Sequence, residues 1–600
     1  MKKRNFVLLL VYATMILSAA DATAVVSIDP SDSKILYTGR WNFSSPSIPS
    51  ASWQGSSIIA KFKGNAISAI FDTGSTTEYF RIIIDDDKAG SNKIPVYNTI
   101  QKYVLASGLT DTEHKIEIVK ETYNGFNWTF HGFEVTGTGL VEPPDRPVRK
   151  IEFYGDSNLA GFSLEHEQNQ GDTSLRGSYY GFAGITSRML NAEYHNISRS
   201  GATISSLHRR YDRLDWWKGK PLWNFDDFSA DVVVVNLGAN DVGSPKNKIK
   251  ANYHALLDDL RTSHPGAHIV LFNGWGWDYD EPANYTWEVI DERHSRGDTN
   301  TSYAIFPWVF EQWHGCEYDH SGMAQVLADH LAGVMGWSPN LGDVMNGFGV
   351  NGDVANGSFE EVAPFGGIGW RYSTADNDIY RVEDPIGAVN GDHYLRLENG
   401  KSVHQPNPAV DGQTFIVNVW MRGFSDGDQA KITIDFRDQE MWTTPLQTAT
   451  DTITLTDDWY QYTMTATAPT GGSKPVYHTR LTFQATRGEY VDFDGVVMSI
   501  SVPSCGDGVC QGDETIENCA MDCGCSSDAD CNDVESCTND ICDTSTGQCI
   551  NNWPVCGLAD GCCGPDCTND PDCFTCIPKG TVCNSDRECC GNKCRGGKCR

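Results

Sequence analysis

The sequence has 600 residues, with 46 lysines and arginines against 79 aspartates and glutamates, which gives a formal net charge of -33 at pH 7. A chain of this length is not expected to fold around one core, and three or four domains are the natural expectation. The acidic balance argues against nucleic acid or an anionic membrane as a partner, because both carry negative charge that such a surface repels.

The first residues have the three parts of a secretory signal peptide. Basic residues at positions 2–4 precede an apolar run from Phe6 to Leu17, and small residues follow up to Ala24. The apolar run is shorter than the roughly 20 residues that a bilayer-spanning helix needs. We therefore expect residues 1–24 to be a signal peptide, and the protein to be secreted and extracellular with no membrane as partner.

Residues 25–145 predict an all-β domain. Short strand-like runs occur at 58–62, 79–85 and 114–119, separated by glycine, aspartate and asparagine turns. A β-sandwich is the natural way for such strands to close around a core. The proline-rich stretch at 143–147 cannot join a helix or a central strand, so it indicates a linker.

Residues 146–340 show a different pattern, in which apolar strands alternate with helical segments. The expected strands are at 151–154, 232–237 and 268–272, and the expected helices lie near 179–190, 249–262 and 323–334. Continuous apolar runs are typical of strands buried on both faces, so this region predicts an α/β domain with a parallel sheet. In such a sheet the loops after the carboxyl ends of the strands form the site.

Residues 354–502 return to strand-like runs and predict a second β-sandwich. The segments Asn356–Glu360 and Gly369–Trp370, with a closing strand at 492–498, resemble the jelly-roll carbohydrate-binding modules of the galactose-binding-like class. Four tryptophans could stack on sugar rings, although core packing is the favoured interpretation for most of them. These are Trp370, Trp420, Trp442 and Trp459.

Residues 504–600 hold cysteine-rich modules. Of the 21 cysteines, 20 lie between Cys505 and Cys599, and this even, crowded set predicts disulfide bonds formed in an oxidising compartment. The last six, from Cys576 onward, look like a small knottin-like unit. Acidic residues could bind a structural calcium ion in the β-sandwich or tail, although a solvated acidic surface is the simpler interpretation. The remaining cysteine, Cys316, is expected to be a buried thiol.

A serine follows the first expected α/β strand, in the segment Gly155-Asp156-Ser157-Asn158-Leu159-Ala160-Gly161. A tight turn between strand and helix would expose the Ser157 hydroxyl at the sheet edge. A hydroxyl is a weak nucleophile until a base takes its proton, so further groups are required for catalysis.

Two later loops could supply an oxyanion hole beside this serine. The second apolar strand ends in Gly238-Ala239-Asn240-Asp241, and a short run ending at Ile197 precedes Ser198-Arg199-Ser200-Gly201. The expected donors are the backbone N–H groups of Ser157 and Gly201 and the side-chain N–H of Asn240. Each motif alone is also typical of an ordinary turn, but the motifs together and in this order favour a catalytic site.

The expected general base is His320, in the segment Glu317-Tyr318-Asp319-His320. Its ordinary pKa lies near neutrality, and a neighbouring carboxylate can fix the tautomer of an imidazole. His314 and His330 are rivals, but only His320 stands at the expected loop-to-helix junction with carboxylates three and one residues before it.

These four blocks resemble the SGNH, or GDSL, hydrolases, with serine at 157, glycine at 201, asparagine at 240 and histidine at 320. Residues 35 to about 335 are more narrowly similar to carbohydrate esterase family 2, in which a small jelly roll precedes the SGNH domain. The matching segments are Ile35–Trp41, Leu105–Leu109, Arg149–Phe153 and Leu190–Asn196. The resemblance implies removal of acetyl groups from hemicellulose, of the acetyl xylan esterase type, on xylan or glucomannan.

The sequence leaves open which group is the third member of a catalytic triad. Glu317 stands where many SGNH enzymes have aspartate, Asp319 is an alternative, and the family can also use a main-chain carbonyl, which would leave a Ser-His dyad. An acyl-enzyme mechanism works in each case, and it requires no metal or organic cofactor. Trp275 and Trp277, after the third apolar strand, are candidates for sugar contact, with Trp277 favoured.

Two other functions compete with the esterase hypothesis. One is an SGNH lipase or phospholipase acting on longer acyl esters, which would need an exposed apolar groove. The other is a non-catalytic glycan-binding protein, in which the serine hydroxyl and its histidine lie beyond hydrogen-bond reach.

Overall fold

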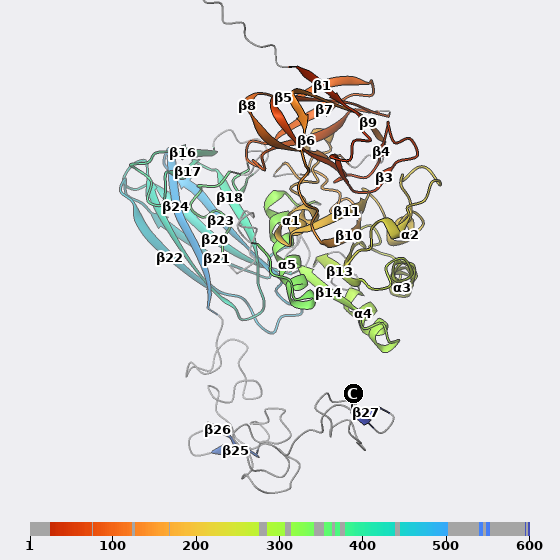
Figure 1. The fold of residues 1–600 in the computed structure, drawn as a ribbon. Helices are drawn as coiled ribbons and strands as arrows, with labels where there is room; N and C mark the ends of the chain where they lie inside the picture. Colours follow the sequence, from red (N-terminus) through yellow and green to blue (C-terminus); the bar gives the residue numbers. More distant parts are fainter. Residues whose placement is uncertain are drawn as a thin grey trace, which may run out of the picture. The chain divides into compact units, whose positions relative to one another are not determined.

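The computed structural model describes residues 24–501 and four short strands in the tail (Figure 1). The ranges left out between 24 and 501 are 75, 123–126, 167–168, 275–284, 307–313, 341–352, 363–366, 373–378 and 439–443. Internal contacts divide the chain into two units, one comprising 1–409, 418–463 and 477–498, and the other 410–417, 464–476 and 499–600. The candidate site lies in the first unit.

Nine strands form the N-terminal β region. They are β1 (Val25–Ile28), β2 (Leu36–Thr38), β3 (Trp41–Asn42), β4 (Ser50–Ala51), β5 (Ser57–Thr73), β6 (Glu78–Ile84), β7 (Asn92–Val96), β8 (Gln101–Lys120) and β9 (Trp128–Leu140). The all-β prediction is confirmed, and the strands are joined into one antiparallel sheet in the order β3-β4-β9-β5-β8-β6-β7, with β1 on β9 and β2 on β5. The long strands have β-bulges, which bend a sheet. Buried aromatic side chains, including Trp128, fill the core.

Five parallel strands form the sheet of the α/β region. They are β10 (Arg149–Gly155), β11 (Ala192–Ser198), β12 (Val232–Asn236), β13 (His268–Gly274) and β14 (Thr301–Phe306), in the order β11-β10-β12-β13-β14. The parallel-sheet prediction is therefore confirmed. All five residues of β12 are buried, which explains its continuous apolar run.

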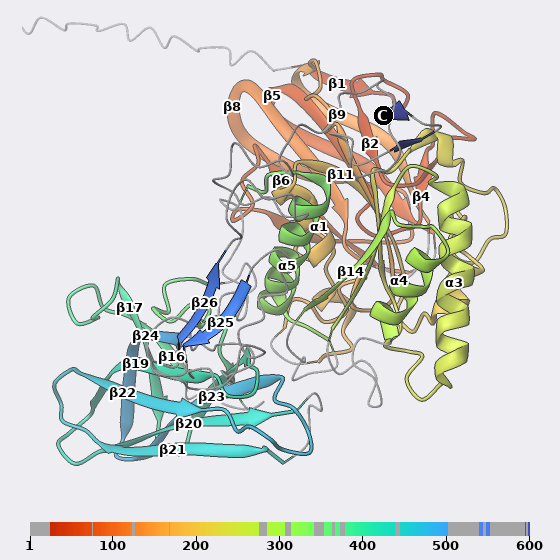
Figure 2. The same cartoon turned by 90° about the horizontal axis from the view of Figure 1, so that it is seen from below.

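Helices cover both faces of this sheet (Figure 2). One hydrophobic cluster joins the sheet to α1 (Phe182–Met189) and α5 (Glu317–Met335), and another joins it to α2 (Ile204–His208), α3 (Lys246–Ser263) and α4 (Thr286–Ser295). The region is thus a three-layer α/β/α sandwich. Short 3₁₀ turns occur at Thr173–Leu175 and Phe225–Asp227.

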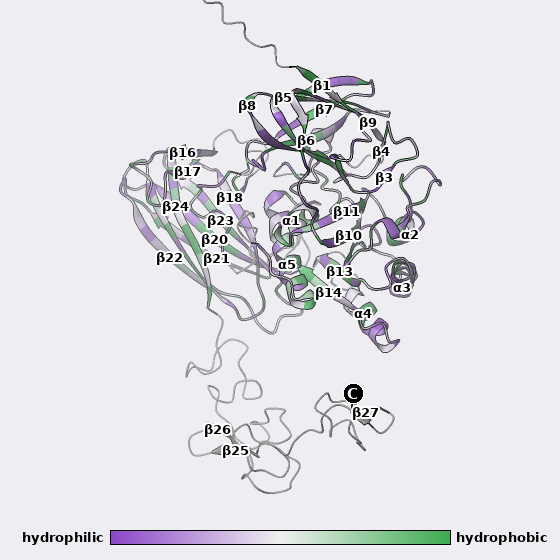
Figure 3. Ribbon diagram, in the orientation of Figure 1, coloured by the Kyte–Doolittle hydropathy of each residue, from purple (hydrophilic) through white to green (hydrophobic). Residues whose placement is uncertain are grey.

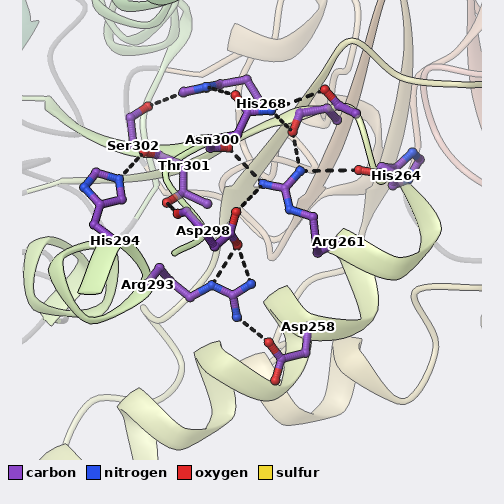
Figure 4. A network of polar contacts seen from close by, with 12 residues as sticks. Asp258, Arg261, His264, His268, Arg293, His294, Asp298, Asn300, Thr301 and Ser302 are labelled. Atoms are coloured by element: carbon purple, nitrogen blue, oxygen red, sulfur yellow. Dashed lines mark hydrogen bonds and ion pairs between the residues drawn. The ribbon is translucent and has the colours of Figure 1, made fainter. Parts of the chain in front are cut away.

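A charged network ties together the sheet edge at which β13 and β14 begin (Figure 4). Arg293 near the end of α4 pairs with Asp298 and Asp258, and Arg261 of α3 lies 3.0 Å from Asp298 and donates to the carbonyl of Asn300 at 2.9 Å. Because the strands are parallel, this edge is opposite to the one that carries the candidate site. The network fixes the ends of two helices without occupying that site.

Residues 371–501 form two five-stranded sheets, so the expectation of a further β-rich region is confirmed. One sheet contains β15 (Arg371–Tyr372), β18 (Ser402–Pro408), β23 (His478–Arg487), β20 (Gln429–Arg437) and β21 (Gln447–Thr454), and the other contains β16 (Ile379–Glu383), β17 (His393–Glu398), β24 (Tyr490–Ser501), β19 (Thr414–Gly423) and β22 (Tyr460–Thr467). Buried and partly exposed residues alternate along β19 and β20. Figure 3 shows hydrophobic and hydrophilic residues on the strands of this region. Trp370 is 0% exposed, so it belongs to the core.

The tail is described only at β25 (Asn539–Asp543), β26 (Gln548–Asn552), β27 (Cys594–Arg595) and β28 (Lys598–Cys599). The expected signal peptide and cysteine pairing fall outside the described residues. Among the helices that are described, none is both long and apolar enough to cross a membrane. Cys316 is buried, as predicted.

Candidate active site

The candidate site is built at the carboxyl end of β10, where the order of strands reverses. After β10 the chain forms β11 on one side of it, and then crosses to form β12 on the other side. Loops separate at such a switch point and leave room for a ligand. Ser157 follows the last residue of β10 by two positions and is 6% exposed.

The imidazole beside this serine belongs to His314. His314 Nε2 lies 2.8 Å from Ser157 Oγ, which is a hydrogen-bond distance. The hypothesis that His320 contacts Ser157 is therefore corrected, because the rival histidine six residues earlier occupies that place.

His320 is turned into the protein interior instead. Helix α5 begins at Glu317, so His320 lies inside its first turn, where its backbone N–H bonds to the Cys316 carbonyl at 3.0 Å. Its side chain is 0% exposed, and its Nδ1 accepts a hydrogen bond from the Phe182 backbone at 3.2 Å. The ring also stacks on Phe182, with centroids 5.8 Å apart. These contacts support the packing of α5 against α1.

The two carboxylates proposed as the triad acid lie at the start of α5. Glu317 is the first residue of the helix and is buried. Asp319 accepts a hydrogen bond from the Cys316 backbone at 2.9 Å and forms an ion pair with Arg371. Asp319 therefore caps the helix, a common role for an acidic residue in a first turn. The described hydrogen bonds of His314 go to neither carboxylate.

The second nitrogen of His314 meets an amide. His314 Nδ1 lies 2.9 Å from Asn169 Oδ1. An amide oxygen can only accept, so this contact places the proton of a neutral imidazole on Nδ1 and leaves Nε2 as an acceptor for the serine hydroxyl. Sequence reasoning missed Asn169, which stands in a polar loop with no recognisable motif.

The expected oxyanion groups lie in loops at the same edge of the sheet. Gly201 has a φ of +76°, a conformation that a glycine adopts without strain, and an added Cβ would meet open space. The Asn240 side-chain nitrogen lies 3.2 Å from Asp156 Oδ2 and 3.1 Å from the Ala202 carbonyl. Both N–H groups of Asn240 thus have acceptors within the protein, so their donation to an oxyanion remains a proposal.

Burial changes the ionisation of several groups at the site. Desolvation raises the pKa of Asp156 to about 7, although hydrogen bonds from Asn158 and Asn240 favour its charged form. Desolvation also lowers the pKa of His314 to about 4, and lowers that of His320 to about 3 with a smaller contribution from His314. Both imidazoles are consequently neutral at pH 7, as a general base must be.

Trp275 and Trp277, proposed to contact sugar, lie outside the described residues. Within the part of the chain that is described, no group of three or more histidine, cysteine, aspartate or glutamate side chains is arranged to hold a metal ion.

Two family models match this chain. Residues 37–144 match the family described as carbohydrate esterase 2 N-terminal, and residues 153–301 match the GDSL-like lipase/acylhydrolase family. The β region is thus similar to the N-terminal domain of carbohydrate esterase 2, and the α/β region is similar to the GDSL-like acylhydrolases. The resemblance found in the sequence is thereby confirmed.

Two curated relatives are similar to about half of this chain. Cellulase/esterase CelE of Acetivibrio thermocellus is 29% identical over 336 residues, which cover 52% of this chain and 40% of CelE. The acetylxylan esterase / glucomannan deacetylase of Cellvibrio japonicus is 25% identical over 362 residues, covering 56% of this chain and 100% of that protein. The match thus spans less than half the length of CelE and the whole of the second relative.

Solved structures of family two carbohydrate esterases are also similar. One from Clostridium thermocellum, in complex with cellohexaose, is 28% identical with a TM-score of 0.47, covering 50% of this chain and 99% of that chain. One from Cellvibrio japonicus is 21% identical with a TM-score of 0.49, covering 52% of this chain and 99% of that chain.

Proposed function

We propose that this protein is a secreted serine esterase that removes O-acetyl groups from hemicellulose, with xylan or glucomannan as its substrate. The observation that carries the proposal is the 2.8 Å contact between Ser157 Oγ and His314 Nε2 at the switch point of a parallel sheet. A hydroxyl held against an unprotonated imidazole nitrogen is the arrangement that nucleophilic catalysis needs.

In the proposed reaction, His314 Nε2 takes the hydroxyl proton while Ser157 Oγ attacks the acetyl carbonyl. The negative charge that forms on the carbonyl oxygen is stabilised by the N–H groups of Ser157 and Gly201, with Asn240 as the third donor. His314 then gives its proton to the ester oxygen of the sugar as the bond to the acetyl carbon breaks, and the sugar leaves with a free hydroxyl. Water activated by His314 finally releases acetate and restores the serine.

Asn240 reaches the oxyanion only if one of its N–H groups turns from its present acceptor. The Ala202 carbonyl lies in the loop that also carries Gly201, so a small movement of that loop would release the Asn240 N–H. Loss of one such donor typically lowers kcat about a hundred- to a thousandfold. Asn240→Ala is therefore expected to lower kcat within that range.

The choice of substrate is supported by the relatives. Both carry carbohydrate-active names, and one is an acetylxylan esterase / glucomannan deacetylase. Neutral polysaccharide also avoids the repulsion that a net charge of -33 would impose on polyanionic substrates. The β-rich region of residues 371–501 would act as a carbohydrate-binding module that holds the chain on the same substrate.

The test compares the purified protein with Ser157→Ala on short-chain and long-chain aryl esters, acetylated xylan and acetylated glucomannan. The parent is expected to prefer the acetyl ester and to release acetate from the polysaccharides, and Ser157→Ala is expected to lose at least about a thousandfold in kcat. Ser295→Ala is a matched control, because Ser295 is exposed at the end of α4. Equal acetate release by the parent and Ser157→Ala would contradict the proposal.

The same set of substrates distinguishes the competing functions. Preference for long-chain esters would indicate a lipase or phospholipase. Retention of polysaccharide without any ester cleavage would indicate a non-catalytic glycan-binding protein.

A further inference from the structure

We propose that Asn169 is a positioning residue for this reaction, whose amide oxygen holds the His314 imidazole in the tautomer and orientation that accept the serine proton. The inference rests on the proposed function, since it assigns a role only if His314 is the base. It differs from the expectation of a carboxylate, because the group that meets the imidazole carries no charge.

The geometry of the ring carries the proposal. The two nitrogens of His314 face two different side chains, with Nε2 at 2.8 Å from Ser157 Oγ and Nδ1 at 2.9 Å from Asn169 Oδ1. A neutral imidazole has one N–H donor and one acceptor, and these two contacts use one each. The three side chains thus form a Ser-His-Asn series in which every hydrogen bond has a compatible direction.

Hydrogen bonds hold the described residues on both sides of Asn169. The Gly177 N–H donates to the Gly161 carbonyl at 3.0 Å and closes the neck of the loop. Gly161 has a φ of +67°, and a Cβ at this position would collide with the Gly177 carbonyl. The Gln170 N–H then donates to Ser163 Oγ at 2.7 Å, immediately after Asn169.

Neighbouring elements fix the two partners further. The His314 ring packs against Phe162 of the same loop, with centroids 4.4 Å apart. Glu165 of this loop lies 2.8 Å from both Arg81 and Lys93, which belong to β6 and β7 of the N-terminal region. The N-terminal region therefore supports the loop from which Asn169 reaches the histidine.

An amide and a carboxylate would have different effects on the base. A carboxylate on Nδ1 stabilises the imidazolium, whereas an amide orients the ring and leaves its charge uncompensated. Among the described residues, His320 on α5 interacts electrostatically with this ring. Asp156 precedes Ser157 in the chain, and the Arg176 guanidinium lies over Phe162 at 5.3 Å. Burial already lowers the pKa of His314 to about 4. The base therefore stays unprotonated in mildly acidic solution.

The experiment uses the full-length protein with Asn169→Asp and Asn169→Ala, measured on an aryl acetate from pH 4 to 8. Asn169→Asp is expected to keep most of the kcat at pH 7 and to move the acidic limb of kcat/KM upward by about one pH unit or more, because it adds a negative charge to Nδ1. Asn169→Ala is expected to lower kcat about tenfold to a hundredfold with KM within about twofold, because the ring loses its orientation.

The control is Asn224→Ala, which removes an exposed asparagine that caps a 3₁₀ turn away from the site. It is expected to leave both kcat and the pH profile unchanged. Thermal unfolding of each variant shows whether the loop still folds. If Asn169→Ala does not fold, the nearly isosteric Asn169→Asp still decides. A carboxylate in contact with Nδ1 moves the acidic limb by about one pH unit or more, whereas a carboxylate lying farther from the ring moves it by less.

Failure of this inference is distinguishable from failure of the proposed function. An Asn169→Ala variant with the parent's kcat, or an Asn169→Asp variant with the parent's acidic limb, would overturn the role of Asn169 while Ser157→Ala remained inactive. If Ser157→Ala were as active as the parent, the esterase mechanism itself would be wrong.

Discussion

Arg40 and Glu152 form a fully buried ion pair between the N-terminal β region and the first strand of the α/β region. The Nε and Nη2 atoms of Arg40 lie 3.0 and 2.9 Å from Glu152 Oε1, and both side chains are 0% exposed. His195 and His264 also approach this carboxylate, at 3.1 and 2.8 Å. The pKa of Glu152 is held well below its usual range by Arg40 and the two histidines, against the effect of burial.

Removal of the Arg40 charge is expected to destabilise the protein strongly. Arg40→Met leaves the Glu152 carboxylate buried without its guanidinium, and breaking a buried pair in this way typically costs about 3–5 kcal/mol in the free energy of unfolding. Denaturant unfolding followed by tryptophan fluorescence measures the loss. The matched control is Lys102→Met, which breaks the exposed Lys102–Glu134 pair and should cost less than about 1 kcal/mol. Equal free energies of unfolding for the two variants would show that the buried pair contributes no more to stability than the exposed pair.

The two histidines near the start of α5 are expected to respond differently to substitution. His314→Ala removes the imidazole that contacts Ser157 and should lower kcat by at least about a thousandfold. His320→Gln keeps an acceptor for the Phe182 N–H, so its kcat should stay within about tenfold of the parent. Kinetics on an aryl acetate distinguish them. A larger loss of kcat in His320→Gln than in His314→Ala would show that His320 is the general base.

Acid should destabilise the folded protein through the same buried histidines. The folded-state pKa of His320 is about 3 and that of His314 is about 4, whereas the ordinary value is 6.5. Between pH 6.5 and about 4 the unfolded chain therefore binds protons that the folded chain does not, and stability falls as pH falls. The loss approaches about 1.4 kcal/mol per pH unit for each histidine.

Replacement of His320 tests this origin of the pH dependence. His320→Gln removes one of the two groups, so the plot of unfolding free energy against pH from 6.5 to 4.5 should become less steep by up to about 1.4 kcal/mol per pH unit. Denaturant unfolding at several pH values gives the slope. An unchanged slope would mean that His320 is already charged in the folded state.

Two glycines at the site edge offer a steric test. Gly161→Ala puts a Cβ against the Gly177 carbonyl at a φ of +67°, so it should cost about 2–4 kcal/mol and lower kcat at least tenfold as the Asn169 loop shifts. Gly201→Ala has a similar φ of +76° but open space around it. It should cost only about 1–2 kcal/mol and retain most of the kcat, since its N–H is kept. Calorimetry and kinetics on both variants check the contrast.

The layers of the fold and the place of the serine could be predicted from the sequence because they follow from periodicity. The valine run of β12 is apolar on both faces, as a central strand of a parallel sheet requires. The turn after β10 carries Ser157 to the sheet edge for the same topological reason. The strand β14 was missed, since its exposed Tyr303 interrupts the apolar pattern.

The partner of the serine could not be chosen correctly from spacing alone. The acidic residues before His320 were interpreted as partners of a catalytic histidine, whereas Asp319 caps α5 and thereby fixes the start of the helix at Glu317. Acidic residues in the first turn are a recognised helix signal, and that interpretation would have placed His320 inside the helix. Asn169 gave no signal, because only the folded loop brings it to His314.

The Arg40–Glu152 pair also bears on how such a chain could change during evolution. Regions joined by an exposed linker can be exchanged between genes, but an α/β region moved alone would carry a carboxylate into its new host without the guanidinium that neutralises it. We expect the two regions to be inherited as one block. Exchange of domains between genes would then be confined to the segments that follow the α/β region.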